Sequence, residues 1–288
     1  ADANPTDRLA TGNKYLDHGK LYVARFDADG TGVWLLLDPS TVTTSGSTLG
    51  ALYGDLPGII LNTRGAGDAV GATPMDRPEW TAVNPLNGDA YLTLTNNSVR
   101  TPAQADAANP RGPNRHGHII RWHDSSDHAS FTWDIFVFGA NAGGNADINR
   151  SGLTELNQFA SPDGMSFDSR GVLWFETDNS EATVTDYTND QLLAVIPTQL
   201  VDDNGKQVPV SAHNQADLRR FFVGPNDCEV TGITFTPDNK TLFINIQHPG
   251  NWPSTDKATD ATPQGTRVRP RSSTVVIQRD DGGEIGTA

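Results

Sequence analysis

Short stretches that alternate apolar and polar residues recur along this chain, and turns rich in Gly, Asn and Asp separate them. Alternation with a period of two is typical of strands that bury one face. It first occurs at 20–26 and 33–37, on either side of a turn at 27–32. Further stretches of this kind lie at 118–123, 131–138, 192–196 and 273–277. We therefore predict an all-β fold.

Two segments depart from simple alternation. Residues 58–62 are consistent with a short strand, or with the start of a helical stretch that continues through 64–70. Residues 211–222 are predicted to form a helix capped by Ser211, because serine at this position accepts a hydrogen bond from the first turn. A Pro-, Thr- and Asp-rich stretch at 251–271 is predicted to be a connection.

One pattern is written three times. A carboxylate opens a strand, a tight turn follows, and a returning strand ends in polar residues; these acid-led hairpins lie at 79–97, 163–178 and 229–248. Antiparallel pairing brings the start of the first strand and the end of the second to one edge. Repeated hairpins suggest the blades of a β-propeller, which would gather three acids around one axis as a site for hard cations. Because few copies are visible, we predict that residues 1–288 form a domain that is only part of such a ring.

The formal net charge of −14 limits the partners of this chain. Such a surface repels nucleic acid and anionic lipid, so we expect neither as a partner. It also repels phosphate, so an anionic substrate would need metal ions or a buried arginine. An acidic surface equally keeps exported proteins soluble, and both explanations stay open. No apolar run approaches the length of a membrane span, and we find no signal peptide at the N-terminus.

Cysteine and histidine give few candidates for a metal site. Cys228 is the only cysteine, which excludes an internal disulfide and Cys-rich zinc sites, and we interpret it as a small buried apolar group. His116 and His118 are one residue apart but have no His or Glu partner at helical spacing, so we expect ordinary strand and loop histidines. Gly-rich phosphate loops, a Gly-x-Ser-x-Gly elbow and a His-Glu-x-x-His motif are absent from the sequence.

The segment with the most candidate functional side chains is Met75-Asp-Arg-Pro-Glu-Trp80. Arg77 is a permanent cation whose planar fork suits phosphate or carboxylate, and Pro78 restricts the backbone between it and Glu79. A guanidinium and a carboxylate two residues apart would hold an oxyanion and a metal side by side. The same two residues would also serve as an internal ion pair between blades, and the sequence leaves both interpretations open.

The other two acid-led hairpins supply Asp163 and Glu229 as candidate metal ligands. Asp163 stands before a glycine, where carboxylate and backbone carbonyl oxygens are both available, as calcium prefers. Pro-Asp-Gly is also an ordinary turn signal. At the returning ends, Asp178, Asn97 and His248 are weaker candidates, because each also suits a cap or a turn.

Several of these motifs resemble the PhoX-type alkaline phosphatases. The resemblance is strongest in Met75-Asp-Arg-Pro-Glu-Trp80 and Cys228-Glu-Val-Thr-Gly232, and it extends to residues 21–26, 94–98, 117–122, 161–164 and 247–250. It implies a bacterial phosphomonoesterase, periplasmic or secreted, that acts on small phosphate esters. The implied fold is a six-bladed propeller with a cluster of iron (Fe3+) and calcium (Ca2+) in its channel.

Carried over by this resemblance, Arg77 would bind the substrate phosphate, and Glu79, Asp163 and Glu229 would bind metal, chiefly calcium. Members of the family are much longer than this chain, and their upstream half supplies further ligands, including a thiolate for iron. The resemblance therefore implies that this chain is a C-terminal portion whose partner is the N-terminal half of the same protein. Cys228 lies in a different motif from that thiolate. Two alternatives are a calcium-dependent propeller lactonase and a non-catalytic propeller segment stabilised by calcium.

Overall fold

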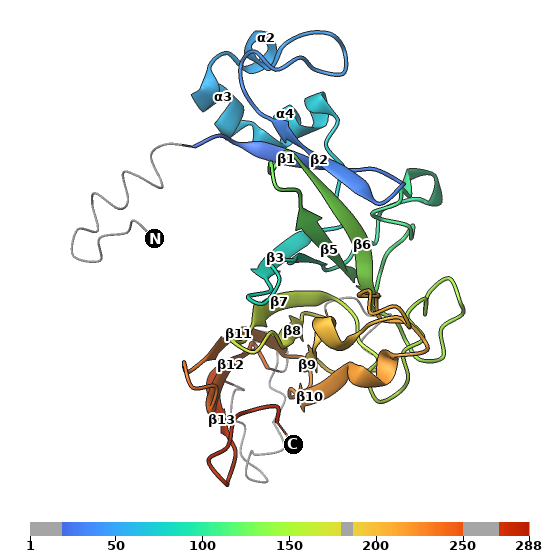
Figure 1. The fold of residues 1–288 in the computed structure, drawn as a ribbon, viewed down its shortest axis with the longest axis vertical. Helices are drawn as coiled ribbons and strands as arrows, with labels where there is room; N and C mark the ends of the chain where they lie inside the picture. The colour runs from blue at the N-terminus through green and yellow to red at the C-terminus, as the bar shows by residue number, and fades with distance from the viewer. Residues whose placement is uncertain (1–18, 180–186, 250–270, 288) are drawn as a thin grey trace, which may run out of the picture. The chain divides into compact units, whose positions relative to one another are not determined.

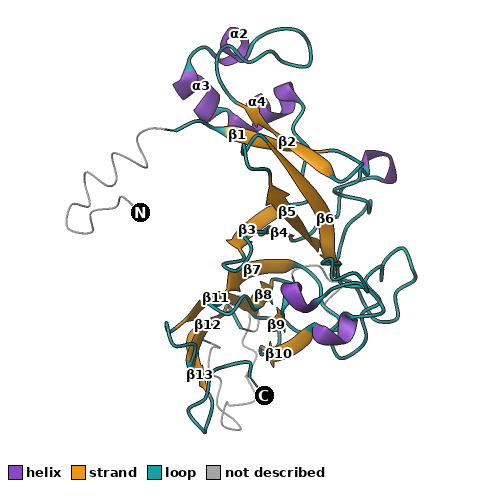
Figure 2. Cartoon of the chain, in the orientation of Figure 1, coloured by secondary structure: helices purple, strands orange, loops and turns teal. Residues whose placement is uncertain are grey.

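A computed structural model describes residues 19–179, 187–249 and 271–287. The chain divides into two compact units, Ala1–Pro74 with Asp124–Phe131, and Met75–His123 with Thr132–Ala288. Strands dominate the fold and the helices are short (Figure 2). The connection predicted at 251–271 lies almost wholly outside the described residues. No described helix has the length and apolar character needed to cross a bilayer.

The first unit combines a hairpin with three short helices. Strands β1 (Tyr22–Phe26) and β2 (Thr31–Leu36) pair antiparallel around the predicted turn. The helices are α2 (Leu49–Tyr53), α3 (Leu56–Leu61) and α4 (Thr63–Val70). Residues 58–70 are therefore helical apart from Asn62, which separates α3 from α4, and the strand alternative for 58–62 is wrong. The side chain of Asp55 caps α3 by accepting from Gly58 N, and Gly71 ends α4 in the left-handed conformation.

The second unit consists of three successive antiparallel meanders (Figure 1). The first contains β3 (Pro78–Val83), β4 (Ala90–Leu94), β5 (His118–Asp124) and β6 (Ser130–Phe138), paired in chain order. The second contains β7 (Pro162–Phe167), β8 (Leu173–Thr177), β9 (Gln191–Val195) and β10 (Arg219–Val223). The third contains β11 (Glu229–Phe235), β12 (Thr241–Gln247) and β13 (Ser273–Gln278). Short 3-10 turns lie at Pro102–Gln104, Pro197–Gln199 and Gln215–Asp217.

The helix predicted at 211–222 is wrong. Only a 3-10 turn at Gln215–Asp217 forms there, and Arg219–Val223 is the strand β10. Along β10 exposed and half-buried residues alternate strictly, which is the period of a strand. Its backbone pairs with β9, and this tertiary pairing outweighs the weak helical preference of the segment.

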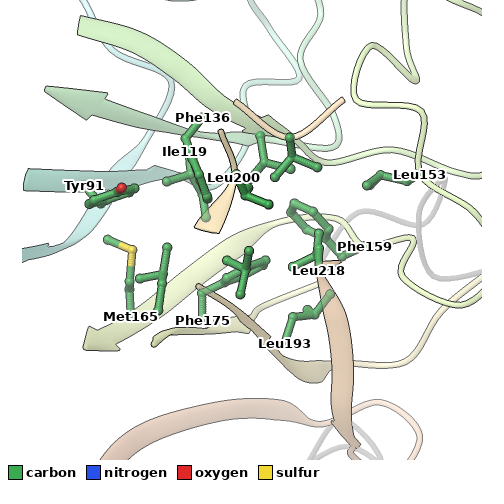
Figure 3. Close-up of a cluster of buried hydrophobic side chains, with 14 of the residues drawn as sticks. Tyr91, Ile119, Phe136, Leu153, Phe159, Met165, Phe175, Leu193, Leu200 and Leu218 are labelled. Atoms are coloured by element: carbon green, nitrogen blue, oxygen red, sulfur yellow. The ribbon is translucent and has the colours of Figure 1, made fainter. Parts of the chain in front are cut away.

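Apolar faces of neighbouring meanders pack against each other. Figure 3 shows side chains from the first two meanders interdigitating, with Tyr91 edge-on to Phe136 at a centroid distance of 5.2 Å. A second core joins the second and third meanders around the fully buried Trp174, whose ring centroid lies 5.3 Å from that of Phe235. Burial of large aromatic side chains is the main stabilising contribution here.

The first strands of the meanders lie next to one another, β3 against β7 and β7 against β11 (Figure 1). Two threonines of the first meander fix this contact. Thr93 Oγ1 donates to Asp163 O at 2.8 Å, and Thr95 Oγ1 donates to Pro162 O at 3.0 Å. These hydrogen bonds fix the start of β7 against the first meander at Asp163, the second candidate acid.

Asp76 is the centre of a buried polar network directly before Arg77. Its carboxylate accepts from Arg100 Nε at 2.6 Å, from Asn97 Nδ2 at 2.9 Å and from Asn114 Nδ2 at 3.0 Å. Asp76 is fully buried and Arg100 is 8% exposed. Buried opposite charges are tolerated when the pair and its remaining hydrogen-bonding capacity are satisfied.

Replacing Asp76 by Ala should therefore destabilise the protein strongly, because it removes the fully buried carboxylate that pairs with Arg100 Nε and leaves the more exposed Asp106, 3.8 Å from Arg100 Nη1, as a weaker counter-charge. We expect a loss of about 3–5 kcal/mol in the free energy of unfolding, measured by urea denaturation. Asp281→Ala is the matched control, since Asp281 pairs with Arg279 in an exposed turn and its loss should change little. Equal unfolding midpoints for the two variants would show that the Asp76 network does not stabilise the unit.

Candidate functional site

The three acid-led hairpins bring their acids to matching positions. Pro78 pairs with Leu94, Pro162 pairs with Thr177, and Glu229 pairs with Gln247. Glu79 and Asp163 each follow the paired proline by one residue, and Glu229 is itself the first residue of β11. Each acid therefore lies at the start of a first strand, opposite the end of its returning strand.

An unusual backbone conformation precedes each acid by two residues. Arg77, Ser161 and Asp227 have φ of 52°, 55° and 57°, a left-handed region that L-residues other than glycine rarely adopt. The carbonyl of Arg77 accepts from Thr95 N at 3.0 Å, and that of Ser161 accepts from Asp178 N at 3.0 Å. In both cases the donor is the residue that follows the returning strand. Strain of this kind is often concentrated at functional sites.

The pairing of the strands is also irregular next to these acids. The register shifts between Pro78 and Thr81, and again between Pro162 and Met165, so Glu79 and Asp163 both lie within a bulge. In the third hairpin the shift comes later, between Thr231 and Thr234. A bulge breaks the alternation of side chains and re-aims one of them. The first two acids therefore both lie where the regular alternation of side chains is interrupted.

We name the group formed by Glu79, Asp163, Asp178 and Glu229 the carboxylate edge. Its members interact electrostatically, and Asp163 shows this most clearly. The pKa of Asp163 is raised to about 7, first by burial and then by the negative charges of the other three carboxylates, while Arg77 opposes the shift. The pKa of Glu229 is raised by burial and by Asp178. The carboxylate edge therefore carries negative charge that Arg77 compensates only in part.

Arg77 joins two of the hairpins. Its Nε lies 3.0 Å from Glu79 Oε1, and its Nη2 lies 3.2 Å from Asp178 Oδ2. The internal ion pair considered from the sequence is thus present. The side chain is nevertheless 43% exposed, and within the described part of the chain its Nη1 makes no hydrogen bond. Arg77 can therefore hold its position through two carboxylates and still present a donor to a ligand.

His248 and Gln247 contact the third acid. His248 Nε2 lies 3.5 Å from Glu229 Oε2, and Gln247 Nε2 donates to the same oxygen. His248 therefore belongs to the candidate site as a partner of Glu229. Asn97 does not, because its Nδ2 donates to Asp76 and its Oδ1 accepts from Val99 N and Arg100 N. This amide is used to fix the loop after β4.

Two further acids near the edge were missed from the sequence. Glu176 on β8 is fully buried, neither of its oxygens has a hydrogen-bond partner among the described residues, and burial raises its pKa to about 8. Asp190 accepts from Thr177 Oγ1 at 2.6 Å, and burial raises its pKa to about 7. A glutamate inside the apolar run Leu173-Trp-Phe-Glu-Thr177 was a signal that could have identified the first.

The donor chemistry of the carboxylate edge fits calcium better than iron. Carboxylates with uncompensated charge, next to an exposed backbone, are the hard oxygen donors that calcium prefers. Cys228 is buried in an apolar cluster and its pKa is raised to about 12, chiefly by burial, so it offers no thiolate to iron. In the arrangement observed, no three His, Cys, Asp or Glu side chains of the described residues could hold a metal ion by themselves. The edge therefore offers carboxylate oxygens of the kind that calcium binds, without forming a complete site from the described residues.

Comparison with known proteins identifies the family of this chain. The family model described as alkaline phosphatase PhoX matches residues 2–250. The solved structure of Pseudomonas fluorescens PhoX in complex with vanadate, a transition state analogue, is 38% identical, with a TM-score of 0.77, and the match covers 97% of this chain and 48% of that one. This chain thus spans about half the length of that relative. No curated protein gives a match. With a family match over most of its residues, the chain belongs to the PhoX alkaline phosphatase family.

Proposed function

We propose that this chain supplies the phosphate-binding arginine and several calcium ligands of a phosphomonoesterase of the alkaline phosphatase type. The observation that carries the proposal is the position of Arg77, held by Glu79 and Asp178 within the carboxylate edge and still 43% exposed. Vanadate is named as a transition state analogue in the related PhoX structure, which supports a phosphoryl-transfer function for the matching half. The proposed substrates are small phosphate esters.

Arg77 acts as the binding and orienting group in this proposal. Its Nη1 donates to a phosphoryl oxygen, while Glu79 and Asp178 keep the guanidinium plane fixed through Nε and Nη2. A donor that is already oriented stabilises charge as it develops on the phosphoryl oxygens, without further reorganisation. The left-handed backbone at Arg77 and the following Pro78 restrict the side chain to this direction.

Glu79, Asp163 and Glu229 would hold calcium, with Asp178 and His248 as neighbours. When bound, the cation would neutralise charge on the phosphoryl group and on the leaving oxygen. Asp163 then takes the charged form, because a cation removes the repulsion that raises its pKa. The described residues offer iron carboxylate oxygens but no available thiolate, and we place the thiolate ligand of iron in the remaining part of a longer protein.

The meanders support a further proposal about architecture. Each begins with a strand that carries an acid, and these strands follow one another as inner strands of propeller blades do. We propose that they are blades of a six-bladed ring completed by the remaining half of the protein. By its family, this protein would be periplasmic or secreted.

Arg77→Ala tests the proposed catalytic role. In the protein that carries this chain, we expect hydrolysis of p-nitrophenyl phosphate to fall by about 10²–10³-fold, because a preoriented donor to the transition state is lost. Bound calcium, measured by elemental analysis, should stay unchanged. Arg279→Ala is the matched control, since Arg279 pairs with Asp281 far along the chain in an exposed turn.

Unchanged turnover of Arg77→Ala would remove Arg77 from the mechanism. Hydrolysis of lactones that is sensitive to chelators, without any phosphatase activity in the parent protein, would instead favour the lactonase alternative. Calcium binding without either activity would favour a non-catalytic segment.

The raised pKa values predict how stability depends on pH when calcium is removed. Asp163 and Asp190 have a folded-state pKa of about 7 and Glu176 of about 8, all above the values of acids in an unfolded chain. Between these values the folded state binds more protons than the unfolded state. The stabilisation that these three groups contribute is therefore fully present below about pH 4 to 5, and it is lost as the pH rises to about 8. The unfolding temperature of the chelated protein should therefore be lower at the alkaline end of this range.

Calcium should restore the unfolding temperature at alkaline pH, because it binds the folded carboxylates. Asp163→Asn should flatten the pH dependence and weaken the response to calcium. Glu155→Gln, which removes an exposed acid elsewhere in the second unit, should behave as the parent. A chelated parent that is equally stable across the range would contradict the charge assignment.

A further inference from the structure

A second cluster of cationic side chains lies in the second unit, separate from Arg77. It lines a pocket of about 470 Å³ formed by the loop after β4 and the loop after β6. The polar and charged lining residues are Arg111, Arg115, His116, Asp147 and Arg150. In a protein with a net charge of −14, three arginines around one hollow are an unusual concentration of positive charge.

Arg111 is the buried member of this pocket. It is 5% exposed, and its Nη atoms donate to the backbone oxygens of Gly117, Gly139 and Ile148. Its Nε is buried and has no hydrogen-bond partner within the described residues. No carboxylate among those residues accepts a hydrogen bond from it. Carbonyl oxygens satisfy donors but do not neutralise charge, so the guanidinium is buried without a counter-ion.

Arg150 adds a second positive charge at the same place. Its guanidinium carbon lies 5.4 Å from the centroid of the Phe138 ring, and that of Arg111 lies 4.9 Å from the same centroid. Among the described residues Arg150 donates to two backbone oxygens, those of Asp147 and Pro110. Burial, followed by the charge of Arg150, lowers the pKa of Arg111 to about 9. The two guanidinium groups therefore repel each other across one aromatic ring.

The other lining groups do not remove this charge. His116 is half-buried, its Nδ1 lies 2.8 Å from Tyr187 Oη, and its pKa is lowered to about 4 by burial and then by Arg111, so it is neutral. Asp147 is the one acid among the described residues that line the pocket, and it is exposed.

We propose that this pocket is a binding site for a phosphate-type oxyanion, distinct from the carboxylate edge. A tetrahedral anion would accept from the Nε of Arg111, which has no partner among the described residues, and from the exposed guanidinium of Arg150, and it would supply counter-charge to the buried arginine. The proposal does not depend on the phosphatase activity, because it rests on residues that the proposed mechanism does not use. Free phosphate and the phosphoryl group of an ester share the required chemistry.

Inorganic phosphate is the probe that tests this site. The binding assay, isothermal titration calorimetry, uses the Arg77→Ala background, so that the proposed substrate site does not contribute. We expect this background to bind phosphate and to gain thermal stability from it. Adding Arg150→Glu should weaken binding by about tenfold or more, because a charge-assisted hydrogen bond is replaced by repulsion. Arg64→Glu, an equal charge change on an exposed residue of α4, should leave binding unchanged.

Circular dichroism shows whether the Arg150→Glu variant folds. Arg150→Gln, a change to a neutral side chain at an exposed position, is a second variant, and it should weaken phosphate binding less than Arg150→Glu does. Comparing phosphate with phenyl phosphate distinguishes the sources: tighter binding of the free ion supports a site for inorganic phosphate, and tighter binding of the ester supports a site for the substrate class. The proposal is overturned if the Arg77→Ala background binds no phosphate. It is also overturned if the Arg150 variants bind as their parent does, or if chloride at equal ionic strength has the same effect.

Discussion

Carboxylates of like charge repel one another, and the candidate site of this chain depends on how that repulsion is offset. Arg77 pairs with Glu79 and Asp178, and His248 lies beside Glu229. Within the described part of the chain Asp163 makes no ion pair, and its pKa is raised to about 7, first by burial and then by the neighbouring carboxylates. An arrangement of this kind is incomplete on electrostatic grounds. A divalent cation is the simplest group that completes it, and its binding would couple site formation to stability.

The same backbone conformation recurs before each of the three hairpin acids. Two residues before each acid the backbone enters the left-handed region, at Arg77, Ser161 and Asp227. Such a conformation costs of order 1–3 kcal/mol in a residue other than glycine, so it persists only where surrounding structure holds it. Here the strand ends do so, because the residue after each of the first two returning strands donates to the strained residue's carbonyl. The repeat is therefore one of backbone geometry as well as of sequence.

Local pattern predicted those parts of the fold that local interactions determine. The hairpin of β1 and β2 follows from alternation and turn residues that lie next to each other in sequence. The segment 211–222 was misassigned because adjacent arginines and adjacent phenylalanines hide the alternation of β10, which becomes visible only in its pairing with β9. The ion pair of Arg77 with Asp178 joins residues 101 positions apart, so no spacing rule could have predicted it. Likewise, Asn97 looks like a ligand in sequence, whereas tertiary structure commits its amide to Asp76.

If the acids of the three hairpins form one cation site, as we propose, anomalous diffraction should locate a metal ion between them. Crystals of the protein that carries this chain would be grown with calcium, which would then be exchanged for terbium, an ion with similar preference for oxygen ligands. We predict an anomalous difference peak within coordination distance of carboxylate oxygens of Glu79, Asp163 and Glu229. Peaks that lie only elsewhere, with these three side chains ordered and free of metal, would contradict the account.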